Sequence, residues 1–530
     1  MGVRVQLGAV AMVLASCGAN QGTATGEATG SQETSDGGGA SSSDGTTAIA
    51  DTTSADSSST GAALVDVPAS GIAIDFVEIN QGVSVRIGEA GQGVGPTDRT
   101  APVIANRLAL VRAFYTIPGD WQPTDIEARL VLQHPDGTTE TVLDHKVVSE
   151  EAFAGDLART FYWGVEAEKM VQGLGYRVEL WEYEPGEAVD ATPPQLPEDG
   201  TFAPVGVEGS DLVMKALIVP IEYDDGMGCN TTPDISDETM QLYQDLMFMM
   251  NPLDAIDMQI REPIQWTTPL TSFSELNVVL SDLRFDDGAP PELYYYGIID
   301  PCAFDVDGFG GMAYDIPTDP TSMDAAYMRA ASGLALSGQP DFSAETFVHE
   351  IGHLQGRRHV TCNGEEAGPD PSYPIIGGAV GEWGFGVIDF GLRHPTVHKD
   401  YMTYCHPVWV STFGWNKVYP VITALSSWDA PSPPTPTRLL AGVLLPDGRE
   451  LWHVVPGATP RDREAESQLE LTIDGSKTTV PAWISEVPDA PGHFTFTAEL
   501  PTAFDDIDAL ARVHRGRRLA IDRSKIRAAR

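Results

Sequence analysis

Basic residues are scarce in this chain of 530 residues. It contains 32 Lys and Arg against 76 Asp and Glu, which gives a formal net charge of −44 at pH 7. Nucleic-acid phosphates and anionic lipid headgroups repel such a chain. The composition therefore excludes a nucleic-acid partner, and we interpret most of the acidity as a source of solubility.

Long apolar runs are also missing, since no stretch of about 18 apolar residues could span a bilayer. A short run, Leu7–Ala15, follows Arg4 and leads to Leu14-Ala15-Ser16-Cys17. This segment resembles the signal peptide and lipobox of bacterial lipoproteins. The resemblance implies that residues 1–16 are removed and that Cys17 carries a lipid, which alone holds the protein to a membrane.

The predicted location follows from this segment. The resemblance implies an exported protein, lipid-anchored to the cell envelope and, in a Gram-negative host, to the outer membrane. An ordinary secretory signal with a chance cysteine would instead make the protein extracellular.

Cysteine is rare, with five in the whole chain. With Cys17 assigned to the lipid, four remain: Cys229, Cys302, Cys362 and Cys405. Four is an even number, as two disulfides require. Export to an oxidising compartment favours their formation.

Aromatic residues are absent from residues 18–64, which are rich in Gly, Ser, Thr, Ala and Asp. This composition cannot bury enough apolar surface to fold. We expect residues 17–64 to be a disordered tether.

Beyond the tether, the composition predicts three folded regions. Residues 66–205 contain short β-type segments with frequent turns, which favours a β-sandwich-like accessory domain or pro-region. Residues 206–428 mix strand and helix patterns, as an α+β domain does. After a proline-rich linker, residues 438–530 again indicate a β-rich, sandwich-like domain. The expected fold is therefore multidomain, with an α+β domain between two β domains.

Hydrophobic periodicity places the elements of the middle region. Helical patterns cover about 236–250 and 272–284, and a third helix is expected after Ser343. Strands are expected around 212–221 and 293–299.

One run of 11 residues carries the chemistry, and it reads His-Glu-x-x-His-x-x-Gly-x-x-His. His349 and His353 are four residues apart and so share one face of a helix. Gly356 can adopt positive φ and end the helix, which allows His359 to return as a third ligand. Three protein ligands leave a fourth position open, as in catalytic zinc sites. Glu350 follows the first ligand and is placed to act as general base.

The motif resembles that of the metzincin zinc peptidases, in which a methionine turn follows it. Met402 lies in Asp400-Tyr401-Met402-Thr403-Tyr404-Cys405, where the resemblance implies the methionine beneath the metal. Tyr404 matches the tyrosine of the Met-x-Tyr pattern in astacin-like and serralysin-like members, whose hydroxyl contacts zinc and then the transition state. A packed tyrosine is the alternative. Asp400 replaces the serine usual in those groups, which leaves the subfamily open.

The resemblance further implies that the segments after the third histidine and after the Met-turn meet beneath the metal. On that basis Cys362 and Cys405 should form a disulfide, which leaves Cys229 to pair with Cys302. The alternative is that one cysteine is an inhibitory zinc ligand, as in some metzincin zymogens.

An edge strand before the zinc helix pairs with substrate in metzincins. The resemblance assigns this role to Gly311, Met312, Ala313 and Tyr314, although a buried strand fits the pattern equally well. The acidic run Asp305-Val306-Asp307-Gly308 raises the additional expectation of a structural Ca²⁺.

The other residues near the motif have plainer interpretations. Arg357 and Arg358 fill variable motif positions, and a solvated helix end explains them. Trp383, Trp409 and Trp415 are expected to pack in the core, or else to shape the pocket beyond the scissile bond.

Taken together, these features predict a zinc-dependent endopeptidase that acts on extracellular or surface proteins. Its expected partners are Zn²⁺ and a protein or glycoprotein substrate, and we expect a monomer. The alternative is a non-catalytic adhesion or binding protein of the cell surface with a structural zinc. The sequence leaves open whether residues 66–205 are inhibitory.

Overall fold

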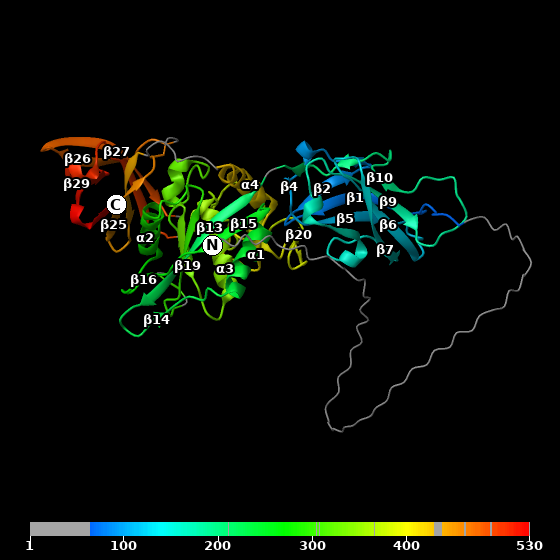
Figure 1. Ribbon diagram of the computed structural model, residues 1–530, viewed down its shortest axis with the longest axis horizontal. Helices are drawn as coiled ribbons and strands as arrows, with labels where there is room; N and C mark the ends of the chain where they lie inside the picture. Colours follow the sequence, from blue (N-terminus) through cyan, green and yellow to red (C-terminus); the bar gives the residue numbers. More distant parts are fainter. Residues whose placement is uncertain are drawn as a thin grey trace, which may run out of the picture.

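The computed structural model describes residues 64–209, 211–303, 305–306, 308–364, 366–428, 437–460, 463–487 and 490–528. They form a multidomain α/β structure in which three regions lie in a row (Figure 1). The signal peptide, Cys17 and the tether up to residue 63 lie outside the described residues, as do the prolines of the linker.

The N-terminal region contains two antiparallel sheets around one core. The sheets have the orders β3-β2-β1-β5-β8 and β10-β9-β6-β7, with β11 also paired to β9. Buried residues of both sheets, such as Val77 and Leu130, belong to one hydrophobic cluster, as expected of a sandwich. The strands are β1 (Ala73–Asn80), β2 (Ser84–Glu89), β3 (Gln92–Gly93), β4 (Val103–Ile104), β5 (Ala109–Thr116), β6 (Thr124–Gln133), β7 (Thr139–Val148), β8 (Phe161–Val165), β9 (Gly175–Glu182), β10 (Gln195–Leu196), β11 (Ala203–Pro204) and β12 (Val207–Glu208).

The middle region is built on a mixed sheet of order β14-β13-β17-β19-β18, with β15 and β16 also paired to β13. Strands β13, β17 and β19 are parallel, whereas β18 runs antiparallel to β19 at one edge. The strands are β13 (Val213–Asp224), β14 (Asn230–Thr231), β15 (Ala255–Ile260), β16 (Ile264–Trp266), β17 (Tyr294–Ile299), β18 (Gly311–Ala313) and β19 (Ala330–Leu334). Four two-residue strands follow in the chain: β20 (Gly384–Phe385), β21 (Leu392–Arg393), β22 (Lys399–Asp400) and β23 (Val408–Trp409).

Helices cover both faces of this sheet. Ala216 and Ile218 of β13 pack in the cluster that includes the buried residues of α1 and α3, whereas Val219 and Ile221 pack with α2. Because side chains alternate along a strand, α1 and α3 lie on one face and α2 lies on the other. The helices are α1 (Asp237–Met250), α2 (Phe273–Asp286), α3 (Pro340–Leu354) and α4 (Thr412–Ser426).

The sequence predicts the first residues of some helices better than those of others. Ser236 and Ser272 cap α1 and α2 close to the predicted starts. Helix α3 begins at Pro340, before the predicted Ser343, because proline fits the first turn of a helix. Helix α4 has no counterpart in the prediction, and Pro420 lies inside it.

The C-terminal region is one curled sheet of order β30-β29-β26-β27-β28-β24-β25-β31, a half-barrel where two stacked sheets were expected. The long strand β27 pairs with β26 through residues 476–482 and with β28 through 482–486. Hydrogen bonding is therefore continuous, and the sheet curls without splitting in two. The strands are β24 (Arg438–Leu444), β25 (Glu450–Pro456), β26 (Ser467–Ile473), β27 (Ser476–Glu486), β28 (Phe494–Glu499), β29 (Ile507–His514), β30 (Arg517–Ile521) and β31 (Ile526–Ala528).

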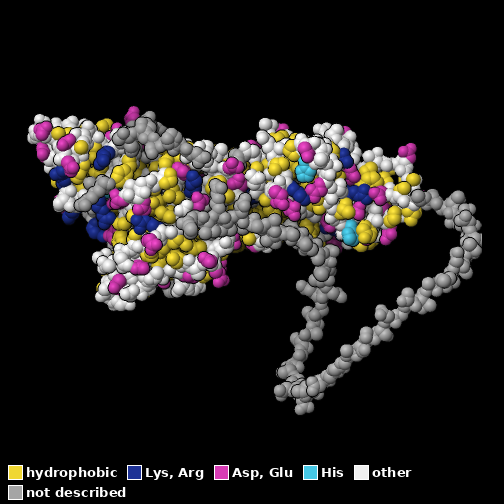
Figure 2. All heavy atoms as spheres, in the orientation of Figure 1, with side chains coloured by type: hydrophobic (Ala, Val, Ile, Leu, Met, Phe, Trp, Pro, Cys, Tyr) yellow, Lys and Arg dark blue, Asp and Glu magenta, His cyan; other side chains and the backbone are white. Residues whose placement is uncertain are grey.

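The surface charges are mixed. Figure 2 shows Asp and Glu side chains scattered over the visible face and several Lys and Arg side chains toward the C-terminal region. Two basic residues of the last strands form ion pairs: Arg512 contacts Glu450 at 2.6 Å, and Arg518 contacts Glu470 at 2.8 Å. No helix among the described residues is both long and apolar enough to cross a membrane.

Candidate metal centre

Helix α3 presents the first two histidines of the motif. His349 and His353 lie one turn apart, and their Nε2 atoms are 3.1 Å from each other. His353 is fully buried, and His349 is partly exposed.

The turn after α3 brings back the third histidine. Gly356 adopts a φ of +84°, and the N–H of Arg357 donates to the Gly352 carbonyl at 2.9 Å. This is the glycine-dependent ending expected of the motif. The ring of His359 then lies 4.8 Å from that of His353, centroid to centroid. One ligand nitrogen from each of the three histidines lies within 4.8 Å of the others, so this triad could hold a metal ion.

Each triad histidine is oriented by a main-chain carbonyl. The Nδ1 atom of His349 lies 2.8 Å from the Tyr401 oxygen, and that of His353 lies 2.7 Å from the Arg357 oxygen. The Nδ1 atom of His359 lies 2.5 Å from the oxygen of Ala367. A carbonyl only accepts, so Nδ1 carries the proton and Nε2 keeps its lone pair.

The donor set fits a tetrahedral metal. Zn–N bonds of about 2.0–2.1 Å place two ligand nitrogens roughly 3.3 Å apart. The 3.1 Å separation between the Nε2 atoms of His349 and His353 is close to that spacing. Two nitrogen lone pairs this close repel each other, and a cation between them removes the repulsion.

Met402 packs against α3 between His349 and His353. It is fully buried, and a Cβ on Gly352 would lie 2.6 Å from its sulfur. Gly352 therefore lets the Met402 sulfur reach the backbone of α3 one residue before His353. The sequence motif leaves this position variable, and only the packing reveals that it needs glycine.

The interpretation of Arg357 as part of a solvated helix end is wrong. Its side chain is 2% exposed, and its Nη2 atom lies 2.9 Å from Oδ1 of Asp400. Burial alone disfavours the charge, but Asp400 outweighs it, and the pKa of Arg357 is raised. Asp400 also accepts from the N–H of Met402 at 3.0 Å and from the hydroxyl of Ser411. The ion pair thus joins the end of the motif to the Met-turn.

Tyr404 lies beside the triad. Its hydroxyl oxygen is 3.1 Å from Nε2 of His359, and 43% of the residue is exposed.

Glu350 follows the first triad histidine on α3 and lies beside the edge strand. It is 4% exposed, and a Cβ on Gly311 would lie 3.0 Å from its Oε1 atom. Strand β18 is the antiparallel edge strand at this place, and all three of its residues are buried, as in the alternative of a buried strand. The side chain of Tyr314 turns away from the triad, since its hydroxyl lies 2.7 Å from Nε2 of His453 in the C-terminal region.

The structure contains two disulfides, Cys229–Cys302 and Cys362–Cys405, in the pairings that the sequence led us to expect. Disulfides are typical of exported proteins in oxidising compartments. Of the acidic run proposed for Ca²⁺, Asp307 lies outside the described residues.

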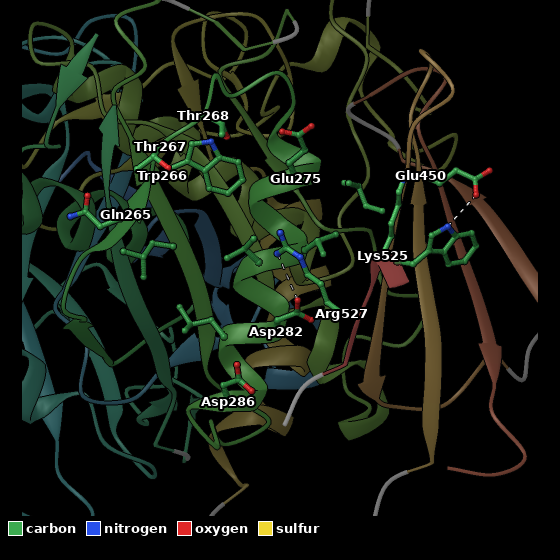
Figure 3. A pocket seen from close by; sticks show the side chains of 16 residues that line it. Gln265, Trp266, Thr267, Thr268, Glu275, Asp282, Asp286, Glu450, Lys525 and Arg527 are labelled. Atoms are coloured by element: carbon green, nitrogen blue, oxygen red, sulfur yellow. Dashed lines mark hydrogen bonds and ion pairs between the residues drawn. The ribbon is translucent and has the colours of Figure 1, made fainter. Parts of the chain in front are cut away.

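A cavity of about 830 Å³ lies elsewhere, between α2 and the C-terminal region. Figure 3 shows Trp266, Asp282 and Asp286 on one side of it and Glu450 and Lys525 toward the other, while Arg527 reaches across to Asp282. Because α2 and α3 cover opposite faces of the sheet, this cavity is separate from the triad.

Comparisons with known proteins assign this chain to no family. No family model matches this chain, and no curated protein matches it. One solved structure that was aligned with this chain is a β-glucuronidase from Parabacteroides merdae with glycerol in its active site. The alignment covers 85% of this chain and 77% of the β-glucuronidase chain, at 9% sequence identity. The TM-score of 0.14 is too low to indicate a shared fold.

Proposed function

We propose that this protein is a zinc-dependent endopeptidase of metzincin type, exported and held to the cell envelope by a lipid on Cys17. The observation that carries the proposal is the triad itself. Three histidines with inward-facing ligand nitrogens converge within 4.8 Å, and a buried glutamate, Glu350, directly follows the first of them on α3. A purely structural metal site needs no base next to its ligands.

The ion expected in this site is Zn²⁺. When bound by three histidines, zinc lowers the pKa of a coordinated water molecule to about 7 and polarises a carbonyl group. Glu350 is placed to accept the proton of the attacking water and to return it to the leaving amine. The hydroxyl of Tyr404 stands beside His359 and is placed to donate a hydrogen bond to the developing oxyanion.

The substrate is an extended stretch of protein or glycoprotein. Gly311–Ala313 form an edge strand beside Glu350, and an edge strand pairs with an added backbone through main-chain hydrogen bonds. Glycine at 311 leaves no side chain between the strand and the carboxylate. This arrangement of a mixed sheet, α1 and α3 on one face and an antiparallel edge supports a zincin-like middle domain.

The alternative is an adhesion or binding protein with a structural metal. The two flanking β regions are the observation that favours it, since such regions are common in surface-binding proteins. It does not account for the buried carboxylate next to the triad.

The deciding experiment measures peptide hydrolysis and metal content together. We expect the wild-type protein to cleave a library of denatured proteins, to lose this activity with a zinc chelator and to regain it with Zn²⁺. Glu350→Gln should keep the zinc and lower the hydrolysis rate by about 10²–10⁴-fold, because a general base contributes that much.

Glu345→Gln is the matched control. It makes the same change on the same helix, at a carboxylate that contacts His406, and it should keep the activity. A Glu350→Gln protein that cleaves as fast as wild type would favour the binding alternative.

A further inference from the structure

A continuous line of hydrogen bonds joins the triad to the N-terminal region. Nδ1 of His349 lies 2.8 Å from the carbonyl oxygen of Tyr401, and the N–H of Tyr401 donates to the carbonyl of Trp409 at 2.8 Å. The indole N–H of Trp409 then donates to the carbonyl of Gly82 at 2.7 Å. Gly82 lies between β1 and β2, so three bonds connect a metal ligand to the N-terminal sandwich.

The turn that carries Gly82 fits closely into the middle region. Gly82 has a φ of +145°, and a Cβ there would lie 2.7 Å from Cζ3 of Trp415 and 3.0 Å from the Met249 oxygen. A Cβ on Gly384 would lie 2.4 Å from Nε1 of Trp409. Two glycines therefore allow the contact that holds the Trp409 indole.

A buried arginine fixes the same turn from the other side. Arg107 is fully buried, and it donates to the Gln81 carbonyl at 2.8 and 2.9 Å and to the Leu253 carbonyl at 2.8 Å. Its guanidinium also lies 4.2 Å from the centre of the Phe248 ring. One side chain of the N-terminal region is thus bonded into the end of α1.

Further bonds cross the junction in both directions. Asn80 donates to the Trp383 carbonyl at 2.8 Å, and Asn416 donates to the Thr100 carbonyl at 2.7 Å. Trp383 and Trp409 belong to the segment between the motif and α4, which also contains the Met-turn. Side chains of each region therefore donate to main-chain carbonyls of the other.

We propose that residues 64–209 are a permanent support of the metal centre and that Trp409 is the positioning residue through which they hold His349. The region is therefore not an inhibitory pro-region that is removed on activation. This inference rests on the proposed metal site but not on peptidase activity.

The first test compares two tryptophans. Trp409→Phe removes the bond to Gly82 and keeps an aromatic ring. Trp121→Phe is the matched control, because the Trp121 indole also donates to a carbonyl, that of Val148 at 2.9 Å, within the N-terminal region. Zn²⁺ affinity is measured by competition with a chromophoric chelator, and the visible spectrum of Co²⁺-loaded protein reports ligand geometry.

We expect Trp409→Phe to weaken Zn²⁺ binding about tenfold, the lower end of the effect of groups that orient metal ligands, and to shift the Co²⁺ spectrum. Trp121→Phe should change neither. A folded Trp409→Phe protein with wild-type affinity and spectrum would overturn the proposal. Failure of the wild type to bind Zn²⁺ at all would instead contradict the proposed metal site.

The second test cuts the chain between the two regions. A specific protease site is inserted after Gly209 in the full chain, which is then cleaved and passed through a gel-filtration column. We expect both pieces to elute together and to retain the metal. Separation of the pieces, with wild-type Zn²⁺ affinity in the larger one, is the behaviour of a removable pro-region and would overturn the proposal.

Discussion

The two junctions that flank the middle region are built from different chemistry. At the N-terminal junction, Arg107 and Trp409 donate hydrogen bonds to main-chain carbonyls. At the C-terminal junction, ionisable side chains contact one another instead. The hydroxyl of Tyr314 lies 2.7 Å from Nε2 of His453, and Nδ1 of His453 lies 2.7 Å from Asp282, which lines the cavity in Figure 3.

The ionisable residues at the two junctions also differ in the pH at which they change charge. Burial lowers the pKa of Arg107 to about 9, so the guanidinium remains charged in neutral and acidic solution. Burial raises the pKa of Asp315 to about 6, against the opposing effects of a hydrogen bond from Thr495 and of nearby Arg463 and Arg358. Arg107 therefore keeps one protonation state over a range in which Asp315 changes its own.

The largest effect is expected at the N-terminal junction. Arg107→Met should lower the free energy of unfolding by about 3–4 kcal/mol, because the carbonyls of Gln81, Leu253 and Met249 would be left buried without this donor. Urea denaturation measures the change. Arg129→Met, at a partly exposed ion pair of the same region, should cost less than about 1 kcal/mol. Equal losses of unfolding free energy in the two variants would mean that Arg107 stabilises the protein no more than a surface ion pair does.

The second prediction concerns pH. Because the pKa of Asp315 is raised in the folded protein, the folded state binds a proton that the unfolded chain has released. The raised pKa of Asp315 adds about 3 kcal/mol to the free energy of unfolding at pH values below about 3.9, the pKa in the unfolded chain. This stabilisation is lost as pH rises from there through about 6.

Thermal unfolding across this pH range measures that decline. Asp315→Asn cannot ionise, so its profile should be flatter, whereas Asp286→Asn, at an exposed carboxylate beside the cavity, should follow the wild type. An unchanged profile for Asp315→Asn would mean that the C-terminal junction is no more pH-sensitive than the N-terminal one.

The smallest effect is expected from Tyr314→Phe. It removes the hydroxyl that contacts His453 and should cost about 1–2 kcal/mol of unfolding free energy, measured in urea. Tyr327 is a matched control, since its buried hydroxyl has no hydrogen-bond partner among the described residues and its ring packs against that of Tyr314. Tyr327→Phe should be nearly neutral. If both changes are neutral, the contact of Tyr314 with His453 does not hold the C-terminal region in place.

The histidine triad is the part that the sequence predicts best, because the residues that determine its geometry are close together in the chain. Two ligands come from one helix turn, and Gly356 fixes the return of His359 within a few residues. Hydrophobic periodicity likewise places α1 and α2, whose serine caps lie next to the helices that they start.

The missed features depend on partners far away in the chain. Arg357 looks like a solvated residue until Asp400, 43 residues later, folds against it. Gly352 is needed only because Met402 packs on it, and Trp409 gains its role from Gly82, 327 residues away. The half-barrel depends on the pairing of β27 with β26 along one part of the strand and with β28 along the rest. Hairpin turns in the sequence do not specify this division.

The disulfide between Cys362 and Cys405 also limits where the protein can reach its final covalent structure. It ties the segment after His359 to the segment that carries Tyr404, across 43 residues. A cytosol keeps such thiols reduced. A newly made chain therefore has its histidines before it has the covalent tie that fixes the third of them against the tyrosine. The segment after His359 and the segment of Tyr404 are therefore joined covalently only in a compartment that allows oxidation.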